Sequence, residues 1–245
     1  MKRIGNDPQS HKRFGRQFAK VAHTDPCTIF SIVLHQVENY DNIILPTIEA
    51  MRYLAMFEYD VMSYSILEAL SDPSRDRTKS DGTHTSLWLQ GLSTFVALLH
   101  KRWPFEVNMM VLYVIKQLAA GNASDLIILR DLVSKLGGLD VVSPADISES
   151  GIYALSGGKT LRAEFASQTT IASLRSSKRS GPTKHLNRLR AALVSTGYGR
   201  PLLLRIAQIR QTSIFTANEG DAVQLKYLSN LHNTVRLFIS HLWLD

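Results

Sequence analysis

The sequence predicts an all-α protein, and three observations support this prediction. Apolar residues recur at helical spacing in several segments; Trp88, Leu92, Phe95, Val96 and Leu99 form one such stripe, at i, i+4, i+7, i+8 and i+11. Proline, glycine and capping residues separate these segments at short intervals. Alternating runs of β-branched residues between hairpin turns are missing. We therefore expect an array of about ten antiparallel helices, a single HEAT-like α-helical repeat domain over residues 1–245, although no motif recurs at a fixed period.

Most of the expected helices have a recognisable beginning or end. Asp25-Pro26 has the pattern of an N-cap followed by proline in the first turn. Pro46 suits the first turn of a helix over 42–56, and Asp60 is expected to cap the next helix. The predicted helices, in chain order, are a basic first helix over 11–20, the helix after Asp25, those over 42–56, 61–70 and 87–102, one from Val107 to Gly121, one from Ser124 or Asp125 to Gly137, a short one after Ser143, and those over 183–195, 201–211 and 219–242.

Composition excludes several classes of protein. The chain has 245 residues, of which 44% are hydrophobic and 20% charged, as in a globular protein rather than a disordered one. Its one cysteine, Cys27, cannot form an intrachain disulfide and is expected to be a buried thiol. The basic N-terminus lacks the apolar core of a signal peptide, and the longest apolar run, 109–115, is too short to span a bilayer. We expect a protein of the cytosol or nucleus.

The net charge of +7 is distributed unevenly. No Asp or Glu occurs between Glu164 and Glu219, and this interval holds nine basic residues. The rest of the chain holds 19 basic and 21 acidic residues. Lys and Arg without intervening carboxylates are what the neutralisation of phosphates requires.

We interpret part of this interval as a contact for nucleic acid or an acidic partner. The alternative, a solvated loop followed by the basic face of a helix, stays open at this point. Residues 165–182 are rich in Ser and Thr and are expected to form a flexible basic loop. Phosphorylation of its serines would cancel the positive charge. The candidate contact residues are Arg175, Lys178, Arg179, Lys184, Arg188 and Arg190.

Enzyme signatures are incomplete in this sequence. Gly158-Lys159-Thr160 resembles the end of a phosphate-binding loop, but Tyr153 occupies the position of the first glycine. His84 and His100 are a helix apart and lack the neighbours of a metal site. The aromatic residues of 88–113 fall on apolar stripes, which favours core packing over a base-stacking platform. We therefore expect no catalytic residues, no metal and no cofactor.

A succession of short motifs resembles the THO complex subunit 2 family. No single motif is diagnostic, but their order is specific, and it extends over nearly the whole chain; the match is poor around 167–181. The motifs, in order, are Asp25-Pro26, Glu38-Asn39-Tyr40-Asp41-Asn42, Tyr59-Asp60-Val61, Ile66-Leu67-Glu68-Ala69-Leu70, Trp88-Leu89-Gln90, Gln117-Leu118, Asp125-Leu126, Gly157-Gly158, Leu161-Arg162-Ala163-Glu164, Ala207-Gln208 and Leu225-Lys226.

The resemblance implies a non-catalytic scaffold in the nucleus. It implies a helical-repeat fold like the middle domain of translation-initiation scaffolds, and a chain that is a segment of a longer protein. It also implies a role in coupling transcription to mRNP assembly and nuclear mRNA export, with other THO subunits, a DEAD-box RNA helicase and mRNA-export adaptors as partners. The alternative is a stand-alone nucleic-acid-binding helical module that uses the basic segment 175–190.

Overall fold

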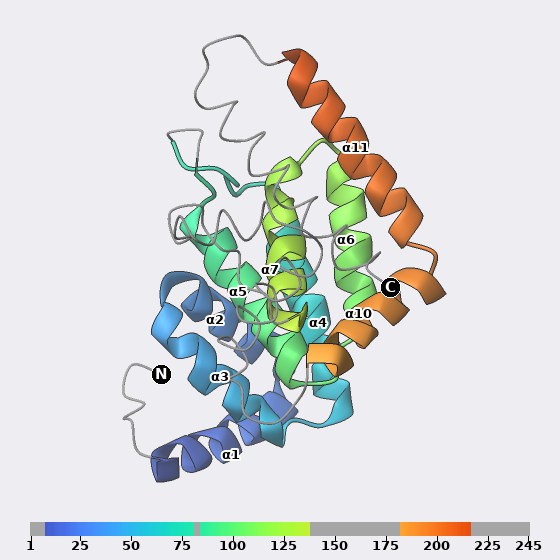
Figure 1. Cartoon of the computed structure of the whole chain (residues 1–245). Helices are drawn as coiled ribbons and strands as arrows, with labels where there is room; N and C mark the ends of the chain where they lie inside the picture. Colours follow the sequence, from blue (N-terminus) through green and yellow to red (C-terminus); the bar gives the residue numbers. More distant parts are fainter. Residues whose placement is uncertain (1–7, 81–83, 138–181, 217–245) are drawn as a thin grey trace, which may run out of the picture.

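The computed structural model describes residues 8–80, 84–137 and 182–216 (Figure 1). These ranges contain nine α-helices and three short 3-10 helices, which confirms the all-α prediction. Within them, β pairing is limited to one isolated bridge between Thr78 and Thr85. No helix in the described ranges combines the length and apolar character that crossing a bilayer requires. The predicted helices after Ser143 and over 219–242 lie outside the described residues, as does the basic loop up to residue 181.

The first two helices meet at the predicted cap. α1 (Pro8–Thr24) is followed by α2 (Pro26–Asn39), and the Asp25 carboxylate accepts a hydrogen bond from the Thr28 N–H at 3.2 Å. Cys27 is exposed, so the expectation of a buried thiol is wrong. Cys27 shares a face of α2 with the buried Phe30, but it lies one turn nearer the start of the helix, outside the part that neighbouring helices cover.

The predicted helix over 42–56 is divided into three short pieces. They are a 3-10 turn over Asp41–Ile43, α3 (Ile44–Ala50) and a second 3-10 turn over Met51–Tyr53. Leu54 and Ala55 are then extended, and the buried Leu54 side chain holds the chain in that conformation.

α4 (Met56–Ser71) therefore begins five residues earlier than predicted. The Glu58 carboxylate accepts a hydrogen bond from the Ala55 N–H and so caps the helix from within its first turn. Asp60 lies inside α4, and its predicted role as the cap is wrong. Sequence spacing alone did not reveal which of the two carboxylates would reach a free N–H.

The next three helices agree closely with the prediction. α5 (Leu87–Arg102) has the predicted bounds. α6 (Val107–Ala119) ends before Gly121, whose φ of 88° lies in the left-handed region that glycine adopts without strain. α7 (Leu126–Gly137) ends at the predicted glycine.

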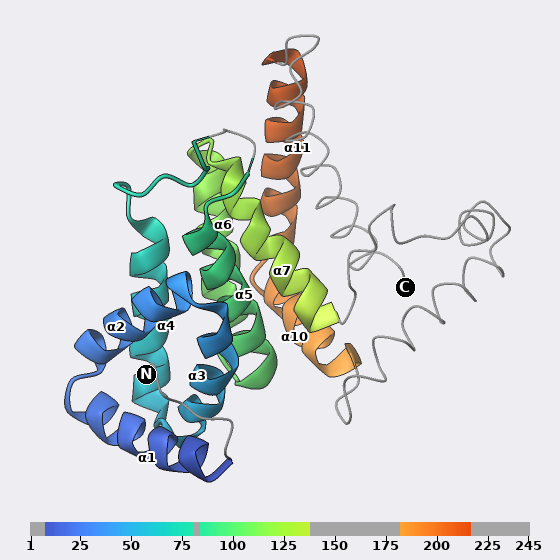
Figure 2. The same cartoon turned by 90° about the vertical axis from the view of Figure 1, so that its left-hand side faces the viewer.

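The helices form an array that advances along the chain. α5 packs between α2 and α7, and α7 packs against α10 (Pro182–Ser195). α1 contacts α2 and α3, whereas α11 (Gly199–Thr216) packs against α6. Figures 1 and 2 place α1 and α11 at opposite ends of this array. This arrangement is typical of helical-repeat proteins, in which each helix contacts mainly its neighbours.

α5 lies at the centre of the core. Its Leu92, Phe95 and Leu99 side chains are fully buried. Gly91 lets α2 approach closely, because a Cβ atom at this position would lie 3.1 Å from the Val37 carbonyl oxygen. The predicted helical stripe is therefore the contact surface between α5 and its neighbours.

The predicted core aromatics occupy two kinds of position. Phe95, Phe105 and Tyr113 are buried. Trp88 and Trp103 are half-buried, and their indole N–H groups donate to the carbonyls of Asp76 at 2.9 Å and Ile48 at 2.8 Å. Each tryptophan thus packs its ring against the core while its polar edge has a backbone partner.

Candidate functional site

Two arginines fix the described part of the segment 72–86, namely residues 72–80 and 84–86, which connect α4 to α5. The Arg75 guanidinium donates to both carboxylate oxygens of Glu38, at 2.8 and 2.9 Å, and lies over the Trp88 ring at 4.1 Å from its centroid. The Arg77 Nε lies 3.1 Å from both carboxylate oxygens of Asp125. Both carboxylates are buried, so these ion pairs anchor the segment to α2 and to the start of α7.

Asp125, one of the two residues predicted to start the helix that ends at Gly137, is a buried ion-pair partner. The Tyr113 hydroxyl donates to the Leu70 carbonyl at 2.8 Å and approaches Asp125 at 3.1 Å. Burial raises the pKa of Asp125 above its ordinary value, and Arg77 opposes this effect; burial also raises the pKa of Tyr113. Because Asp125 has no exposed surface, a substrate cannot reach its carboxylate, and the cluster serves the fold.

The described histidines do not assemble a metal site. Among the described residues, no group of three or more His, Cys, Asp and Glu side chains could hold a metal ion. His100 is buried, and its Nδ1–H donates to the Val96 carbonyl at 2.7 Å, which fixes the ring within α5. Burial lowers the pKa of His100, and the nearby Arg188 lowers it further.

The structure describes three of the six predicted contact residues. Arg175, Lys178 and Arg179 lie outside the described residues, so their role stays a prediction. Lys184 belongs to the first turn of α10. Arg190, further along the same helix, is half-buried. Arg188, also on α10, has its guanidinium directed at the backbone between the end of α5 and Phe105.

Arg188 holds α10 against the end of α5. Its guanidinium donates to the carbonyls of His100 at 2.9 Å and Phe105 at 2.8 Å, with Trp103 at 3.4 Å. The His100 carbonyl lies in the last turn of α5, where carbonyls lack intrahelical partners, whereas Trp103 and Phe105 belong to the connection that follows the helix; Arg188 supplies donors to all three. Burial lowers the pKa of Arg188. Arg188 lies one turn before the buried Ala192 on the same face of α10, and only the packing of this helix revealed its inward position.

Three further arginines outside the predicted set are exposed on α11. They are Arg200, Arg205 and Arg210, and neither α10 nor α11 contains Asp or Glu. Arg205 donates to the neighbouring Gln208 side chain at 3.1 Å. This end of the array therefore carries positive charge that the two helices themselves do not neutralise.

Comparison with known proteins gives consistent matches along the chain. The model of the Thoc2 family, described as a transcription- and export-related complex subunit, matches residues 18–93. These residues extend from α1 into α5 and include the Arg75–Glu38 ion pair. The chain is 34% identical over 233 residues, 95% of its length, to human THO complex subunit 2. The chain is homologous to THO complex subunit 2.

More distant homologues bear the same name. The Arabidopsis thaliana THO complex subunit 2 is 33% identical over 211 residues, which cover 84% of this chain and 11% of that protein. The Saccharomyces cerevisiae THO complex subunit 2 is 29% identical over 148 residues, 60% of this chain and 9% of that protein. The chain spans about 14% of the length of its human homologue. The resemblance inferred from the motif order is thus confirmed.

Proposed function

We propose that this chain is a non-catalytic scaffold module of a THO complex. The observation that carries the proposal is the homology over 95% of the chain to a protein named as a subunit of that complex. The array of short helices supports it, because such arrays present extended surfaces to several partners. The buried, internally paired state of Asp125 and His100 also supports a structural rather than a catalytic role for these residues.

The proposal includes the partners and the location that the resemblance implies. The module binds other THO subunits and a DEAD-box RNA helicase, and the assembly recruits mRNA-export adaptors in the nucleus. It thereby takes part in coupling transcription to mRNP assembly and mRNA export.

A binding experiment tests the scaffold role. The purified full chain is mixed with the THO subunits and the DEAD-box helicase of the same organism and analysed by size-exclusion chromatography. We expect co-elution with at least one of them. A Leu92→Asp variant, which places a charge in the core of α5, is the control for binding by misfolded protein. Failure of the wild-type chain to bind either the subunits or the helicase would contradict the scaffold role.

A second function, nucleic-acid binding by the segment 175–190, follows from the charge of the C-terminal end. The exposed Arg200, Arg205 and Arg210 favour it, since α11 extends the positive region beyond the predicted residues. Reversing the charge at Arg175, Lys178 and Arg179 should weaken RNA binding and reduce its salt dependence, because each phosphate contact releases counterions. An unchanged affinity in a titration against salt would remove this second function.

A further inference from the structure

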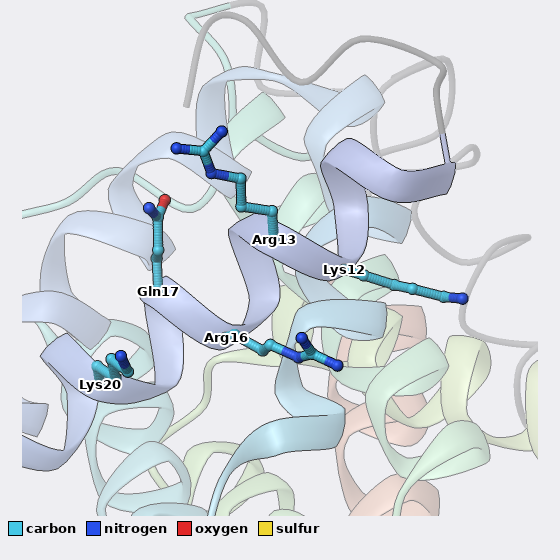
Figure 3. Close-up of a pocket in the computed structure, with 5 residues that line it drawn as sticks. All are labelled: Lys12, Arg13, Arg16, Gln17 and Lys20. Atoms are coloured by element: carbon cyan, nitrogen blue, oxygen red, sulfur yellow. The ribbon is translucent and has the colours of Figure 1, made fainter.

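α1 has an exposed cationic side, and its residues are not among the six contact residues predicted from the sequence. We define the α1 basic face as Lys12, Arg13, Arg16, Gln17 and Lys20, which line a shallow groove along the helix (Figure 3). All five residues are exposed. At about 100° per residue they span about 140° of the helix circumference. Figure 3 shows their side chains extending outward from successive turns of α1.

The opposite side of α1 is fixed to the array. Phe18 and Ala22 are buried, and the Phe18 ring lies 6.3 Å from that of Phe30 in α2. Gly15 lets the helix rest on Tyr53, because a Cβ atom at this position would lie 2.7 Å from two atoms of the tyrosine ring. The basic face therefore projects from a helix that tertiary contacts hold in place, and binding does not require the helix to fold first.

The charge of the basic face is not neutralised within the described residues. α1 contains no Asp or Glu, and no ion pair in the described ranges involves its four cations. Two carboxylates near the C-terminal end of α1, those of Asp25 and Glu58, accept hydrogen bonds from other groups. Asp25 caps α2, whereas Glu58 accepts from His23 at 3.2 Å and from the Ala55 N–H. The face thus presents four positive charges to a ligand.

The chemistry of the face favours a phosphate backbone over a protein partner. The cores of protein interfaces are enriched in aromatic residues, Met and Arg and depleted in Lys, whereas this face has no aromatic residue and takes two of its four cations from Lys. Single-stranded nucleic acids bind largely through base stacking on aromatic rings, but Phe14 and Phe18 face the array. Lys12, Arg16 and Lys20 follow one another at about 6 Å along the helix axis, from the rise of 1.5 Å per residue. This row suits contacts with phosphates along a duplex.

We propose that the α1 basic face binds the phosphate backbone of a nucleic-acid duplex without contacting its bases. The inference does not rest on the scaffold role, because the isolated full chain should show the binding. It also uses residues distinct from the segment 175–190. Figure 2 places α1 at the opposite end of the array from α11.

The experiment uses two variants that remove the same charge from different places. Lys12→Gln/Lys20→Gln removes two lysines from the basic face. Lys79→Gln/Lys116→Gln removes two exposed lysines from the 72–86 segment and from α6. Affinities for a 20-base-pair DNA duplex, an RNA duplex of the same sequence and the matching single strands are measured by fluorescence anisotropy as salt increases. Thermal unfolding of each variant checks that the fold is unchanged.

We expect the first variant to bind both duplexes about 50-fold more weakly at 0.1 M salt, with a log–log salt slope reduced by about 2, since each phosphate contact contributes about 0.9 to that slope. We expect the control to bind within about threefold of the wild type. DNA and RNA duplexes should lose affinity equally, because the contacts are with phosphates.

Four results would overturn the proposal. Equal losses in the two variants would indicate a general effect of net charge, and unchanged affinity in both would remove the site. If a single strand binds more tightly than the duplex and its affinity falls as much in Lys12→Gln/Lys20→Gln, the ligand of the face is a single strand and not a duplex. A glutamate-rich peptide that competes as well as the duplex would indicate an acidic protein partner instead.

Discussion

α1 and α10 are both basic helices without a carboxylate, yet they use their cations differently. In α1, all four Lys and Arg side chains are exposed on one side. In α10, Arg188 faces the array and donates to the carbonyls of His100, in the last turn of α5, and of Phe105, just beyond that helix. The difference teaches that a basic stretch of sequence becomes a basic surface only when its cations lie opposite the buried apolar stripe.

The comparison also changes the picture of the net charge. Residues 165–218 contribute +9 and α1 contributes +4, while the remaining 15 basic and 21 acidic residues give −6. The positive charge is therefore concentrated in two regions and not in the C-terminal segment alone. The described parts of these regions lie at the two ends of the array (Figure 1).

The largest effect should come from removing the inward-facing cation. Arg188→Met leaves the carbonyls of His100 and Phe105 without their charged donor, and hydrogen bonds to charged groups contribute about 1.5 to 3 kcal/mol. We expect the free energy of unfolding in urea to fall by about 2 to 3 kcal/mol. A loss below about 0.5 kcal/mol would mean that Arg188 is as dispensable for folding as a surface cation.

A slightly smaller effect should follow from overpacking the contact between α1 and the array. In Gly15→Val, the new side chain overlaps the Tyr53 ring, and overpacking of this kind costs about 1 to 3 kcal/mol. Urea unfolding should show a loss of about 2 kcal/mol. Adding Tyr53→Ala to the same chain should restore part of it, since the space that the ring occupied becomes available. If the second substitution deepens the loss, the Gly15–Tyr53 contact is not its cause.

The effect of pH should be smaller and should depend on the buried histidine of α5. Because the pKa of His100 is lowered in the folded state, the unfolded chain binds a proton near its ordinary value of about 6.5 that the folded chain does not bind. Stability should therefore fall as the pH falls below that value, by at most about 1 kcal/mol between pH 6.5 and 5.5. The difference between the wild type and His100→Gln in urea unfolding at several pH values isolates this contribution; a constant difference would contradict it.

The Arg188→Met variant links this prediction to α10. The positive charge of Arg188 is one cause of the lowered pKa of His100. Its removal should raise that pKa toward the ordinary value and make the stability of the variant less sensitive to acid. An unchanged pH dependence would show that burial alone accounts for the shift.

The smallest effect on stability should come from the exposed cations of α1. Arg16→Met changes a side chain that makes no ion pair in the described residues, and surface substitutions of this kind stay within about 0.5 kcal/mol. Urea unfolding of this variant is the matched control for Arg188→Met. A loss comparable with that of Arg188→Met would abolish the distinction between the two helices.

Several helices could be predicted because their signals are local. The apolar stripe and the flanking Ser86 and Pro104 were enough to give α5 its observed bounds. The Asp25-Pro26 cap was likewise predictable, since the cap and its partner Thr28 are three residues apart. Within one or two turns, periodicity and capping chemistry determine the backbone.

Other features depended on contacts between distant residues. The break before α4 requires a buried Leu54 and a cap from Glu58, and the helical pattern of 42–56 did not indicate it. The anchors of the 72–86 segment pair Arg75 with Glu38 and Arg77 with Asp125, which are 37 and 48 residues apart. Spacing along the chain contains no signal for such pairs.

The sequence by itself determined that this chain is an all-α array, that its helices begin and end near most of the predicted caps, and that it resembles THO complex subunit 2. The tertiary structure alone decided which cations are exposed. Arg188 meets the Phe105 carbonyl across 83 residues of sequence, whereas the cations of α1 have no such partner among the described residues. The physical reason is that helix formation depends on residues a few positions apart. The hydrogen-bond partners of a charged side chain depend instead on which distant residues the fold places beside it.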